Sequence, residues 1–390
     1  MHILYDHQIF YRQNYGGVSR YFCELMNRFS VDPEISFTLP LHYVQNDNLE
    51  QFPHLNQYWS GRYHFLYNTH LISTIGKKMR YNAINFSLNY IVNNRGESVR
   101  LLKKQDFDIF HPTYYEPYFL PYLQKKPFVL TVYDMIHEIF PMYFKTRDKT
   151  KERKKILIEH AEAVIAISEN TKRDILKFTD VDPDRVHVVH LGNPFEYMEG
   201  SPQINMHSQS LVFGKPYILF VGGREAYKNF DFFIASIAGF LRKYEDLHVI
   251  CAGSLPFSPR ERTMLENLNV LNKVHHIKIN DLLLKKLYAN ALAFVFPSIY
   301  EGFGLPVLEA FSCGCPVILS NSSSLPEVGG DAAIYFELGN SESLRSAVEQ
   351  VICDNSLRRS LIKKGSERVK LFSWKKTARC TKTIYEKCLL

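Results

Sequence analysis

The stretch "YEGFGLPVLEA", residues 300 to 310, decides the fold of this chain. A short apolar run rich in strand-forming residues, "LAFVFPS" (292–298), precedes it, and a second run, "CPVILSN" (315–321), follows it. Because short apolar runs bounded by Gly, Pro and Ser are typical of buried strands, the quoted stretch is predicted to be a loop followed by a helix. We interpret the whole as the crossover of a strand–helix–strand unit in a parallel sheet.

Similar apolar runs alternate with helical patterns along the rest of the chain. In the second half they are "PYILFVGG" (216–223), "LHVICAG" (247–253) and "KVHHIKI" (273–279). In the first half they are "HILY" (2–5), "FDIFH" (107–111), "PFVLTVYD" (127–134), "AVIAIS" (163–168) and "RVHVVHLG" (185–192). This alternation predicts an α/β protein with two Rossmann-like, doubly wound domains that face each other across a cleft.

The predicted domain boundaries follow from composition. A length of 390 residues exceeds one comfortable core and suits two domains. The polar stretch 202–211 has almost no periodicity and is predicted to link a first domain, 1–200, to a second domain, 212–372. The helical segment 373–390 finds no obvious room in the second domain, so we expect it to pack back on the first.

Charge and hydropathy exclude several classes of protein. With 46% hydrophobic and 22% charged residues, the chain is not disordered. A net charge of +7 suits phosphorylated ligands or an anionic lipid surface better than a dedicated DNA-binding role, and no nucleic acid partner is expected. We expect no basic tail to concentrate that charge.

We expect a cytoplasmic protein with reduced thiols. The first residues, "MHILYDHQIF", lack the features of a signal peptide, and no run approaches 18 uninterrupted apolar residues. The seven cysteines are an odd number scattered through apolar segments. Cys313 and Cys315 have no second pair of ligands nearby, so we predict structural thiols there rather than a metal site.

The loop "GGREAYKN" (222–229) has the properties of a phosphate site. Gly222 and Gly223 allow a tight turn after a predicted strand, and Arg224 and Lys228 stand just before a predicted helix. A helix N-terminus with free amides favours an anion, and Arg and Lys add a planar fork and a point charge. The alternative interpretation is a solvated basic loop.

The two glutamates of the opening stretch flank a second such helix start. Gly302 and Gly304 permit close approach of a ligand, and Pro306 suits the first turn of a helix that begins near Leu305. Carboxylates repel phosphate but accept hydrogen bonds from hydroxyls, so Glu301 and Glu309 are predicted to bind hydroxyl groups. Hydroxyls at both ends and phosphates between them describe a nucleotide sugar. Alternatively, Glu301 caps the helix and Glu309 faces solvent.

These motifs resemble family 4 of the retaining glycosyltransferases, the glycogen-synthase-like group with the GT-B fold. The resemblance rests on Arg224 with Lys228, on "EGFGLPVLEA", "CGCPVI" and "LPEVGGDAAIYF" in the second half, and less specifically on Gly16-Gly17 with Arg20, "FDIFHPT", "TVYDMIHEIFP" and "AISENTKRDI" in the first. It implies that Gly223, Arg224 and Lys228 hold the donor diphosphate and that Glu309 binds the ribose. It implies further that Glu301, with the backbone of Phe303, Gly304 and Leu305, binds the sugar, while the Gly16-Gly17 loop closes over the phosphates.

One departure from the family pattern concerns the acceptor side. Many relatives have His-Asp where this chain has Tyr133-Asp134, so the usual histidine cannot be carried over. Asp134 is the better match and is expected to be catalytic together with Arg224, Lys228 and Glu301. Arg20, Tyr133 and His137 are candidates for the acceptor side. Alternatively, Asp134 caps a turn and His137 has only structural hydrogen bonds.

The resemblance implies transfer of a sugar, with retention, from a nucleoside diphosphate to a hydroxyl of a glycan or lipid-linked glycan. By analogy we expect GDP-mannose as the donor, although a UDP-linked sugar is also compatible, and we expect surface polysaccharide as the product. A nucleotide-sugar epimerase or hydrolase and a non-catalytic nucleotide-sugar binder remain as alternatives. The aromatic and basic region 62–104 suggests contact with an anionic membrane, or else a solvated helical face.

No cofactor or metal is expected, because fixed cations and helix amides take the place of a metal ion. Two Asp-x-Asp pairs could hold a cation on a diphosphate in transferases of another fold. Asp106 and Asp108 precede a predicted strand instead of following it, and Asp182 and Asp184 bracket a proline. We interpret both pairs as turn residues.

Overall fold

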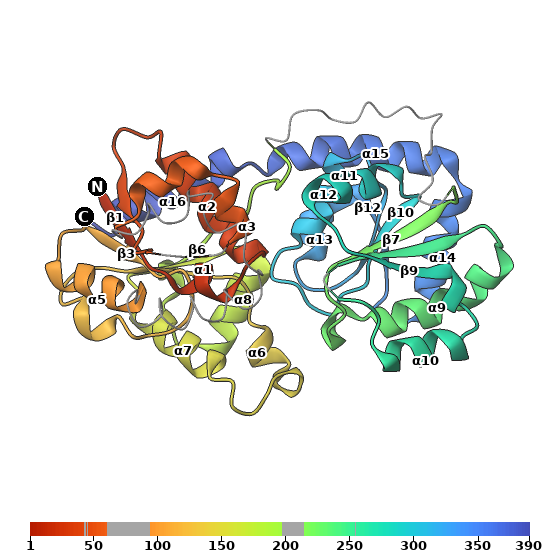
Figure 1. Cartoon of the computed structure of the whole chain (residues 1–390), viewed down its shortest axis with the longest axis horizontal. Helices are drawn as coiled ribbons and strands as arrows, with labels where there is room; N and C mark the ends of the chain where they lie inside the picture. Colours follow the sequence, from red (N-terminus) through yellow and green to blue (C-terminus); the bar gives the residue numbers. More distant parts are fainter. Residues whose placement is uncertain (43, 45, 61–93, 197–213, 254) are drawn as a thin grey trace, which may run out of the picture.

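A computed structural model describes residues 1–42, 44, 46–60, 94–196, 214–253 and 255–390. The chain forms two α/β domains side by side, and both of its ends lie on the first domain (Figure 1). The predicted linker 202–211 lies outside the described residues.

The first domain is built on two three-stranded parallel sheets, with strand orders β2-β1-β3 and β4-β5-β6. A parallel bridge between Phe110 and Phe128 joins β3 to β4, so the six strands form one continuous layer. The strands are β1 (His2–Tyr5), β2 (Ser36–Thr38), β3 (Ile109–His111), β4 (Val129–Val132), β5 (Ala163–Ala166) and β6 (Val186–Val188).

The second domain has one parallel sheet of order β12-β11-β10-β7-β8-β9. Numbered within the domain, this order is 3-2-1-4-5-6 read from the opposite edge, which is that of a dinucleotide-binding Rossmann fold. The strands are β7 (Tyr217–Val221), β8 (His248–Ala252), β9 (Val274–Ile277), β10 (Ala293–Phe296), β11 (Val317–Ser320) and β12 (Ala333–Phe336). The ten strands predicted from apolar runs are confirmed, whereas β2 and β12 were not predicted as strands.

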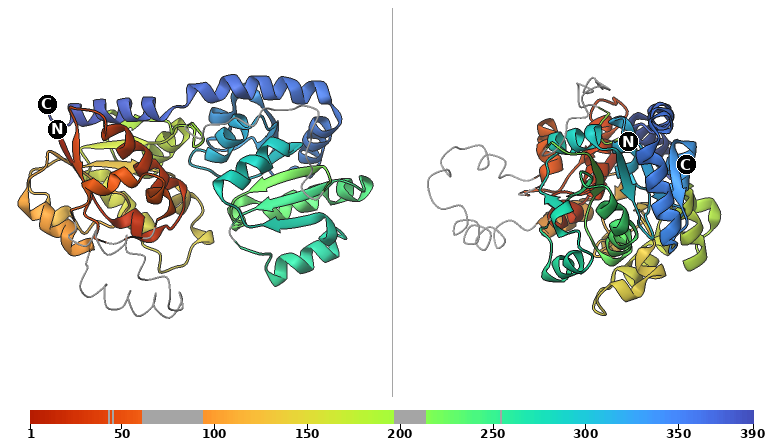
Figure 2. Two further views of the ribbon diagram at one scale, coloured as in Figure 1. Left: turned by 45° about the horizontal axis from the view of Figure 1, so that its top comes forward. Right: turned by 90° about the vertical axis from the view of Figure 1, so that its right-hand side faces the viewer.

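Helices cover both faces of each sheet (Figures 1 and 2), which is why central strands such as β5, β7 and β10 are buried along their whole length. The first domain contains α1 (Gln8–Arg12), α2 (Gly17–Phe29), α3 (Asp47–Glu50), α5 (Asn94–Lys104), α6 (Ile136–Ile139), α7 (Thr150–His160) and α8 (Glu169–Phe178). The second contains α9 (Phe230–Lys243), α10 (Pro259–Asn267), α11 (Asp281–Asn290), α12 (Leu305–Ser312), α13 (Leu325–Gly329), α14 (Ser341–Cys353) and α15 (Asn355–Arg368).

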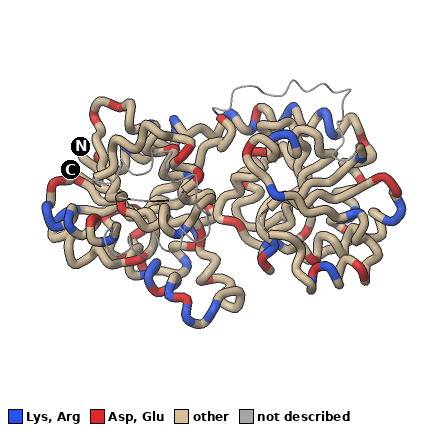
Figure 3. The backbone as a smooth tube through the Cα atoms, in the orientation of Figure 1, with Lys and Arg blue, Asp and Glu red and all other residues tan. Residues whose placement is uncertain are grey.

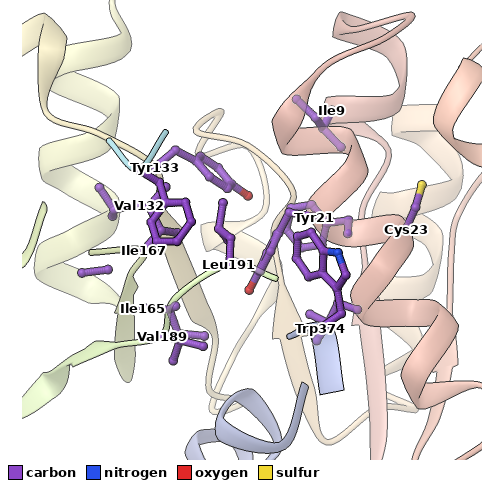
Figure 4. Close-up of a cluster of buried hydrophobic side chains, with 14 of the residues drawn as sticks. Ile9, Tyr21, Cys23, Val132, Tyr133, Ile165, Ile167, Val189, Leu191 and Trp374 are labelled. Carbon is purple, nitrogen blue, oxygen red and sulfur yellow. The ribbon is translucent and has the colours of Figure 1, made fainter. Parts of the chain in front are cut away.

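The last helix, α16 (Trp374–Lys387), packs against α2 of the first domain. Trp374 is 1% exposed and its indole N–H donates to the Asn193 carbonyl over 3.0 Å. A side chain at Gly192 would collide with the Trp374 backbone. Figure 4 shows Trp374 beside Tyr21, within a cluster of buried side chains. The chain therefore crosses between the domains twice.

All seven cysteines are free thiols, as predicted, and Cys23, Cys251, Cys313 and Cys315 are buried. Within the described residues, no helix is long and apolar enough to cross a membrane.

The strand orders locate the functional loops. In a doubly wound sheet, ligands bind at the carboxyl edge where the strand order reverses. In the second domain this point lies between β7 and β10, and the loops that follow these two strands carry Arg224 with Lys228 and Glu301 with Gly302.

Candidate active site

Helix α12 begins as predicted, at Leu305 with Pro306 in its first turn. Its N-cap, Gly304, has φ +109, a left-handed conformation that favours glycine. A β-carbon there would also lie 3.1 Å from the Leu325 side chain. The start of α12 therefore depends on a glycine, and its first amides have no partner within the helix. Glu301 and Glu309 flank these amides.

At the Glu301 end of α12, which we define by Lys228, Glu301 and Gly302, the lysine and the glutamate form an ion pair. The Lys228 Nζ lies 2.7 Å from Glu301 Oε1, and both side chains are less than one-fifth exposed. Burial alone would lower the pKa of Lys228, but the charge and hydrogen bond of Glu301, together with Tyr227 and Glu225, raise that pKa overall. Lys228 therefore stays charged beside a helix start.

Arg224, by contrast, does not join Lys228. Its Nε donates to Glu261 over 2.6 Å, its Nη2 donates to the carbonyls of Leu255 and Pro256, and its guanidinium lies over the Phe257 ring. A partly buried cation is stabilised by a counter-charge, and Arg224 and Lys228 are each paired with a separate carboxylate. Arg224 can reach a diphosphate beside Lys228 only by leaving Glu261.

We define the Glu309 end of α12 by Asp281, Tyr288 and Glu309. No cation of the described residues lies within ion-pair distance of the Glu309 carboxylate. The Tyr288 hydroxyl donates to Glu309 Oε2 over 3.0 Å. Burial raises the pKa of Glu309 to about 7, although the Arg20 charge and the Tyr288 hydrogen bond oppose the rise. Glu309 therefore titrates near neutral pH.

Three side chains of the first domain converge on Asp281, the first residue of α11. The Tyr15 hydroxyl donates to Asp281 Oδ1 over 2.8 Å, and Arg20 Nη1 and Gln51 Nε2 each lie 3.3 Å from Oδ2. Sequence reasoning missed Tyr15 and Asp281. Asp281 follows the end of β9, which is the signal that could have found it. Arg20, expected on the acceptor side, lies instead at the Glu309 end.

The Gly16-Gly17 loop lies against α12, on the opposite side of the interface. Gly17 opens α2, and a β-carbon on it would lie 3.3 Å from the Leu305 Cδ1 atom. The loop thus lies beside the first turn of α12, and its predicted closure over donor phosphates stays a prediction. A larger residue at position 17 would push against Leu305.

The turn at Tyr133-Asp134 touches Gly302. A β-carbon on Gly302 would lie 1.7 Å from the Tyr133 carbonyl oxygen, so only glycine allows this contact between domains. The hydroxyls of Ser168 and Thr171 donate to the Gly302 carbonyl over 2.7 and 3.2 Å. The glycine next to Glu301 is thus held on two sides by the first domain.

Asp134 both caps a turn and is partly exposed. Its Oδ1 accepts a hydrogen bond from the Ile136 N–H over 3.1 Å, and its side chain is 36% exposed. The buried Lys154 donates to the Asp134 carbonyl over 2.8 Å and to Glu138 Oε2 over 2.9 Å. Lys154 and Glu138 therefore hold the backbone of the turn in place. The Asp134 side-chain hydrogen bond to the Ile136 N–H uses Oδ1 and leaves Oδ2 available.

Tyr133 and His137 do not form a group with Asp134. The Tyr133 ring is 7% exposed and lies in the buried cluster with Tyr21 (Figure 4). His137 stacks on Phe144 at 3.8 Å, and burial and Lys154 lower its pKa. His137 Nε2 lies 3.8 Å from Asp148 Oδ2, so the surroundings of His137 leave its role a prediction, and Tyr133 meets the interface through its backbone.

Glu327, in the quoted "LPEVGG" motif, joins the domains at another point. Its carboxylate accepts hydrogen bonds from the first amides of α8, those of Glu169 and Asn170, and lies 2.7 Å from His190 Nε2. An open pocket of about 650 Å³ adjoins this contact, with a hydroxyl- and amide-rich lining that suits a hydroxylated ligand. It is lined by Glu169, Asn170, Arg173, Asn321, Ser322, Ser323, Pro326 and Glu327.

Phe303 and Gly223, the remaining predicted site residues, lie against other side chains of the protein. Phe303 is 3% exposed and packs edge-on against Phe372, so it can offer a ligand only its backbone. Gly223 lies against the Glu225 side chain.

The Asp-x-Asp pairs lie in turns. Asp108 accepts from the His2 amide and Asp182 from the Asp184 amide. No group of three or more His, Cys, Asp or Glu residues that could hold a metal ion occurs in the described part of the chain.

Comparison with known proteins identifies chains that are similar to this one. The model of glycosyl transferases group 1 matches residues 203–368, and that of glycosyltransferase family 4 matches residues 64–194. O-antigen chain mannosyltransferase B of Escherichia coli is 26% identical over 95% of this chain and 96% of its own length. O-antigen chain mannosyltransferase RfbU of Salmonella typhimurium is 27% identical over 57% of this chain and 60% of its own length.

Solved structures share the fold. Anabaena HepE, in complex with UDP and glucose, superposes with a TM-score of 0.71 at 16% identity, over 99% of this chain and all of its own. Sucrose-phosphate synthase of Thermosynechococcus elongatus gives a TM-score of 0.72 at 17% identity, over 99% of this chain and 98% of its own.

Two facing Rossmann-like domains with this arrangement at their interface define a glycosyltransferase of the GT-B class. The chain is therefore a glycosyltransferase, and its two halves are similar to glycosyltransferase family 4 and to glycosyl transferases group 1.

Proposed function

We propose that this enzyme transfers mannose from GDP-mannose to a hydroxyl of a glycan or lipid-linked glycan during surface polysaccharide synthesis. The sugar class is supported by the named activity of the E. coli relative that spans nearly the whole chain. The observation that carries the proposal is the Lys228–Glu301 pair beside the start of α12, in contact with the Tyr133-Asp134 turn through Gly302. The Lys228 cation, the free amides of α12 and the Glu301 carboxylate, which can accept a hydrogen bond from a hydroxyl group, lie together there at the boundary between the domains.

The difficult step is departure of the anionic diphosphate. Lys228 and the first amides of α12 would stabilise the negative charge that develops on the leaving oxygen, and Arg224 would add to them after leaving Glu261. Glu301 would accept a hydrogen bond from a hydroxyl of the transferred sugar. Because these donors occupy the place of a metal ion, we propose a reaction that needs none.

Retention belongs to the same proposal. The bond between the anomeric carbon and the phosphate oxygen breaks, and the acceptor oxygen forms a new bond to that carbon on the same face. The proton of the acceptor hydroxyl passes to the leaving phosphate oxygen, so the products are the mannoside and GDP. Asp134, whose side chain is 36% exposed, would orient the acceptor.

Mass spectrometry after incubation with a panel of nucleotide sugars and acceptor glycans tests the donor. We expect a mannosyl product from GDP-mannose, and GDP release only when an acceptor is present. Release without an acceptor would indicate a hydrolase, conversion of the donor without release an epimerase, and binding alone a non-catalytic protein. An assay in excess EDTA tests the metal: loss of activity that Mg²⁺ or Mn²⁺ restores would contradict the proposed mechanism.

A further inference from the structure

The positive charge of this protein is concentrated in its last two helices. Residues 354–390 contain eleven Lys and Arg against three Asp and Glu, whereas residues 1–353 contain 36 against 37. The net charge of the whole chain is +7. The expectation that no tail concentrates the charge was therefore wrong, and the rest of the protein is close to neutral.

The fold arranges these charges in a line. Helix α15, the short turn η10 (Val369–Leu371) and α16 follow one another along one side of the molecule, over the second domain and then the first (Figure 2). We call residues 355–387 the C-terminal ridge. Its inner face is buried, through residues that include Leu361 and Gly365 on α15 and Trp374 and Tyr385 on α16. Its outer face is left to solvent, and Figure 3 shows several of its cations along the top of the second domain.

Six cations on the outer face are exposed and unpaired. Lys364, Lys370 and Lys382 have carboxylate partners. Among the described residues, no carboxylate lies within ion-pair distance of the other exposed cations of the ridge, which are Arg359, Lys363, Lys375, Lys376, Arg379 and Lys387. These six charges are available to a partner that carries many anions.

One exposed apolar side chain interrupts this row. Leu371, at the junction of the two helices, is 55% exposed. An aliphatic side chain between long cationic ones is typical of a helix that lies in the plane of a membrane interface, where Lys and Arg reach the headgroups and the apolar group enters the acyl boundary.

We propose that the C-terminal ridge docks on an anionic lipid surface. Helices α15 and α16 follow one another along one side of the molecule (Figure 2), so their exposed cations extend along that side and suit an extended layer of headgroup phosphates. Its exposed side chains include no aromatic ring for stacking on bases, so the described ridge is a poorer match to single-stranded nucleic acid. Binding of the ridge to lipid does not depend on the proposed function. Only the reason for this binding rests on that function, because a lipid-linked acceptor would lie at such a surface.

Vesicle sedimentation with the full chain tests the proposal. Lys375→Glu, Lys376→Glu and Arg379→Glu are combined in a ridge variant. Lys103→Glu, Lys104→Glu and Lys125→Glu, which make the same charge change on exposed residues of the first domain, are combined in a control variant. The control also tests part of the region 62–104, most of which lies outside the described residues. The new glutamates of the ridge variant lie mainly in the first turn of α16, which the helix dipole favours, so the fold should be kept.

We expect the wild type to bind phosphatidylglycerol-containing vesicles at low salt at least tenfold more strongly than phosphatidylcholine vesicles. Each engaged cation contributes about fivefold to partitioning, so the ridge variant should lose at least about twentyfold while the control keeps its binding. Leu371→Ser should lower binding a few-fold. Thermal unfolding of both variants checks that the fold is intact.

Three results would overturn the proposal. They are equal binding of the wild type to both vesicle types, equal loss in the ridge and control variants, and ridge-dependent binding to a single-stranded oligonucleotide that is tighter than binding to vesicles. Sugar transfer to a short soluble acceptor, measured without lipid, should be unchanged in the ridge variant. If the wild type itself transfers no sugar, the proposed function fails, and the vesicle result still decides the role of the ridge.

Discussion

Glu301 lies just before α12 and Glu309 lies within it, and the partners of these two carboxylates come from different places. Glu301 is paired at 2.7 Å with Lys228, a cation of its own domain. The Glu309 carboxylate accepts a hydrogen bond from the Tyr288 hydroxyl and has no cation partner among the described residues, and the neighbouring Asp281 receives hydrogen bonds from the first domain. The Glu301 end therefore has its charges balanced within one domain, whereas the Glu309 end is completed only when the two domains meet.

We infer from this difference that Glu301 and Glu309 have different roles. A paired, charged Glu301 beside a cation suits a group where charge develops during reaction. A poorly solvated Glu309 without a cation suits a group that gains a partner when a ligand supplies hydroxyl donors. Each end can be altered separately, which allows the comparison to be tested.

The largest effect is expected from Glu301→Gln. The amide keeps the shape but cannot balance Lys228 or accept as strongly from a sugar hydroxyl, so kcat should fall by about a hundredfold. The affinity for the nucleoside diphosphate alone should stay the same or rise, because Lys228 is released to meet phosphate. Turnover assays paired with calorimetry of the diphosphate measure both quantities. A parallel loss of diphosphate affinity would show that Glu301 does not act on the sugar.

Glu309→Gln is expected to weaken binding of the diphosphate and of the intact donor alike. Loss of a charged hydrogen bond to the ribose should cost about 1.5–3 kcal/mol in both cases. Calorimetry with each ligand measures the two changes, and Glu301→Gln, at the other carboxylate beside the start of α12, serves as the matched control. If neither ligand binds less well, Glu309 has no ribose contact and our placement of the donor is wrong.

The affinity of the wild type should also depend on pH through Glu309. Its pKa is about 7, and ribose hydroxyls donate to the ionised form, so affinity should be present above pH 7 and lost as the pH falls through it. Between pH 8 and pH 6 the ionised fraction falls by up to about tenfold, and affinity should follow. The phosphate of the ligand also titrates near pH 6. The pH dependence of affinity measured for Glu309→Gln therefore gives the contribution that does not come from Glu309. The same pH dependence in that variant would exclude Glu309 as its source.

The smallest effect is expected from Asp281→Asn, which weakens the bridge from Tyr15, Arg20 and Gln51. Donor KM should rise by about fivefold with little change in kcat, since the bridge joins the domains near the proposed nucleoside site and away from the proposed reacting atoms. Tyr15→Phe should give part of this effect. A fall in kcat as large as that of Glu301→Gln would mean that the Glu309 end takes part in the chemical step.

Part of the candidate site was predictable from neighbouring residues. The apolar runs located the strands, and the glycines and Pro306 located the start of α12, because backbone conformation and burial in a parallel sheet depend on short-range patterns. The rule that functional loops follow strands then selected Lys228, Glu301 and Glu309 correctly as neighbours of one helix. The rule also predicted that Arg224 lies nearby. It did not predict the hydrogen bond from Arg224 to Glu261, which crosses the loop after β8.

The sequence by itself determined the class of fold, the helix with its two glutamates, and the concentration of positive charge in the last 37 residues. Only the tertiary structure decided which charges meet. Tyr15 reaches Asp281 across 266 residues of chain, Tyr133 turns its ring into the core, and Arg20 lies at the Glu309 end. The physical reason is that periodicity and turn chemistry act over a few residues. The partner of a buried charge is instead chosen by whichever groups the packing of two domains brings within a few ångströms.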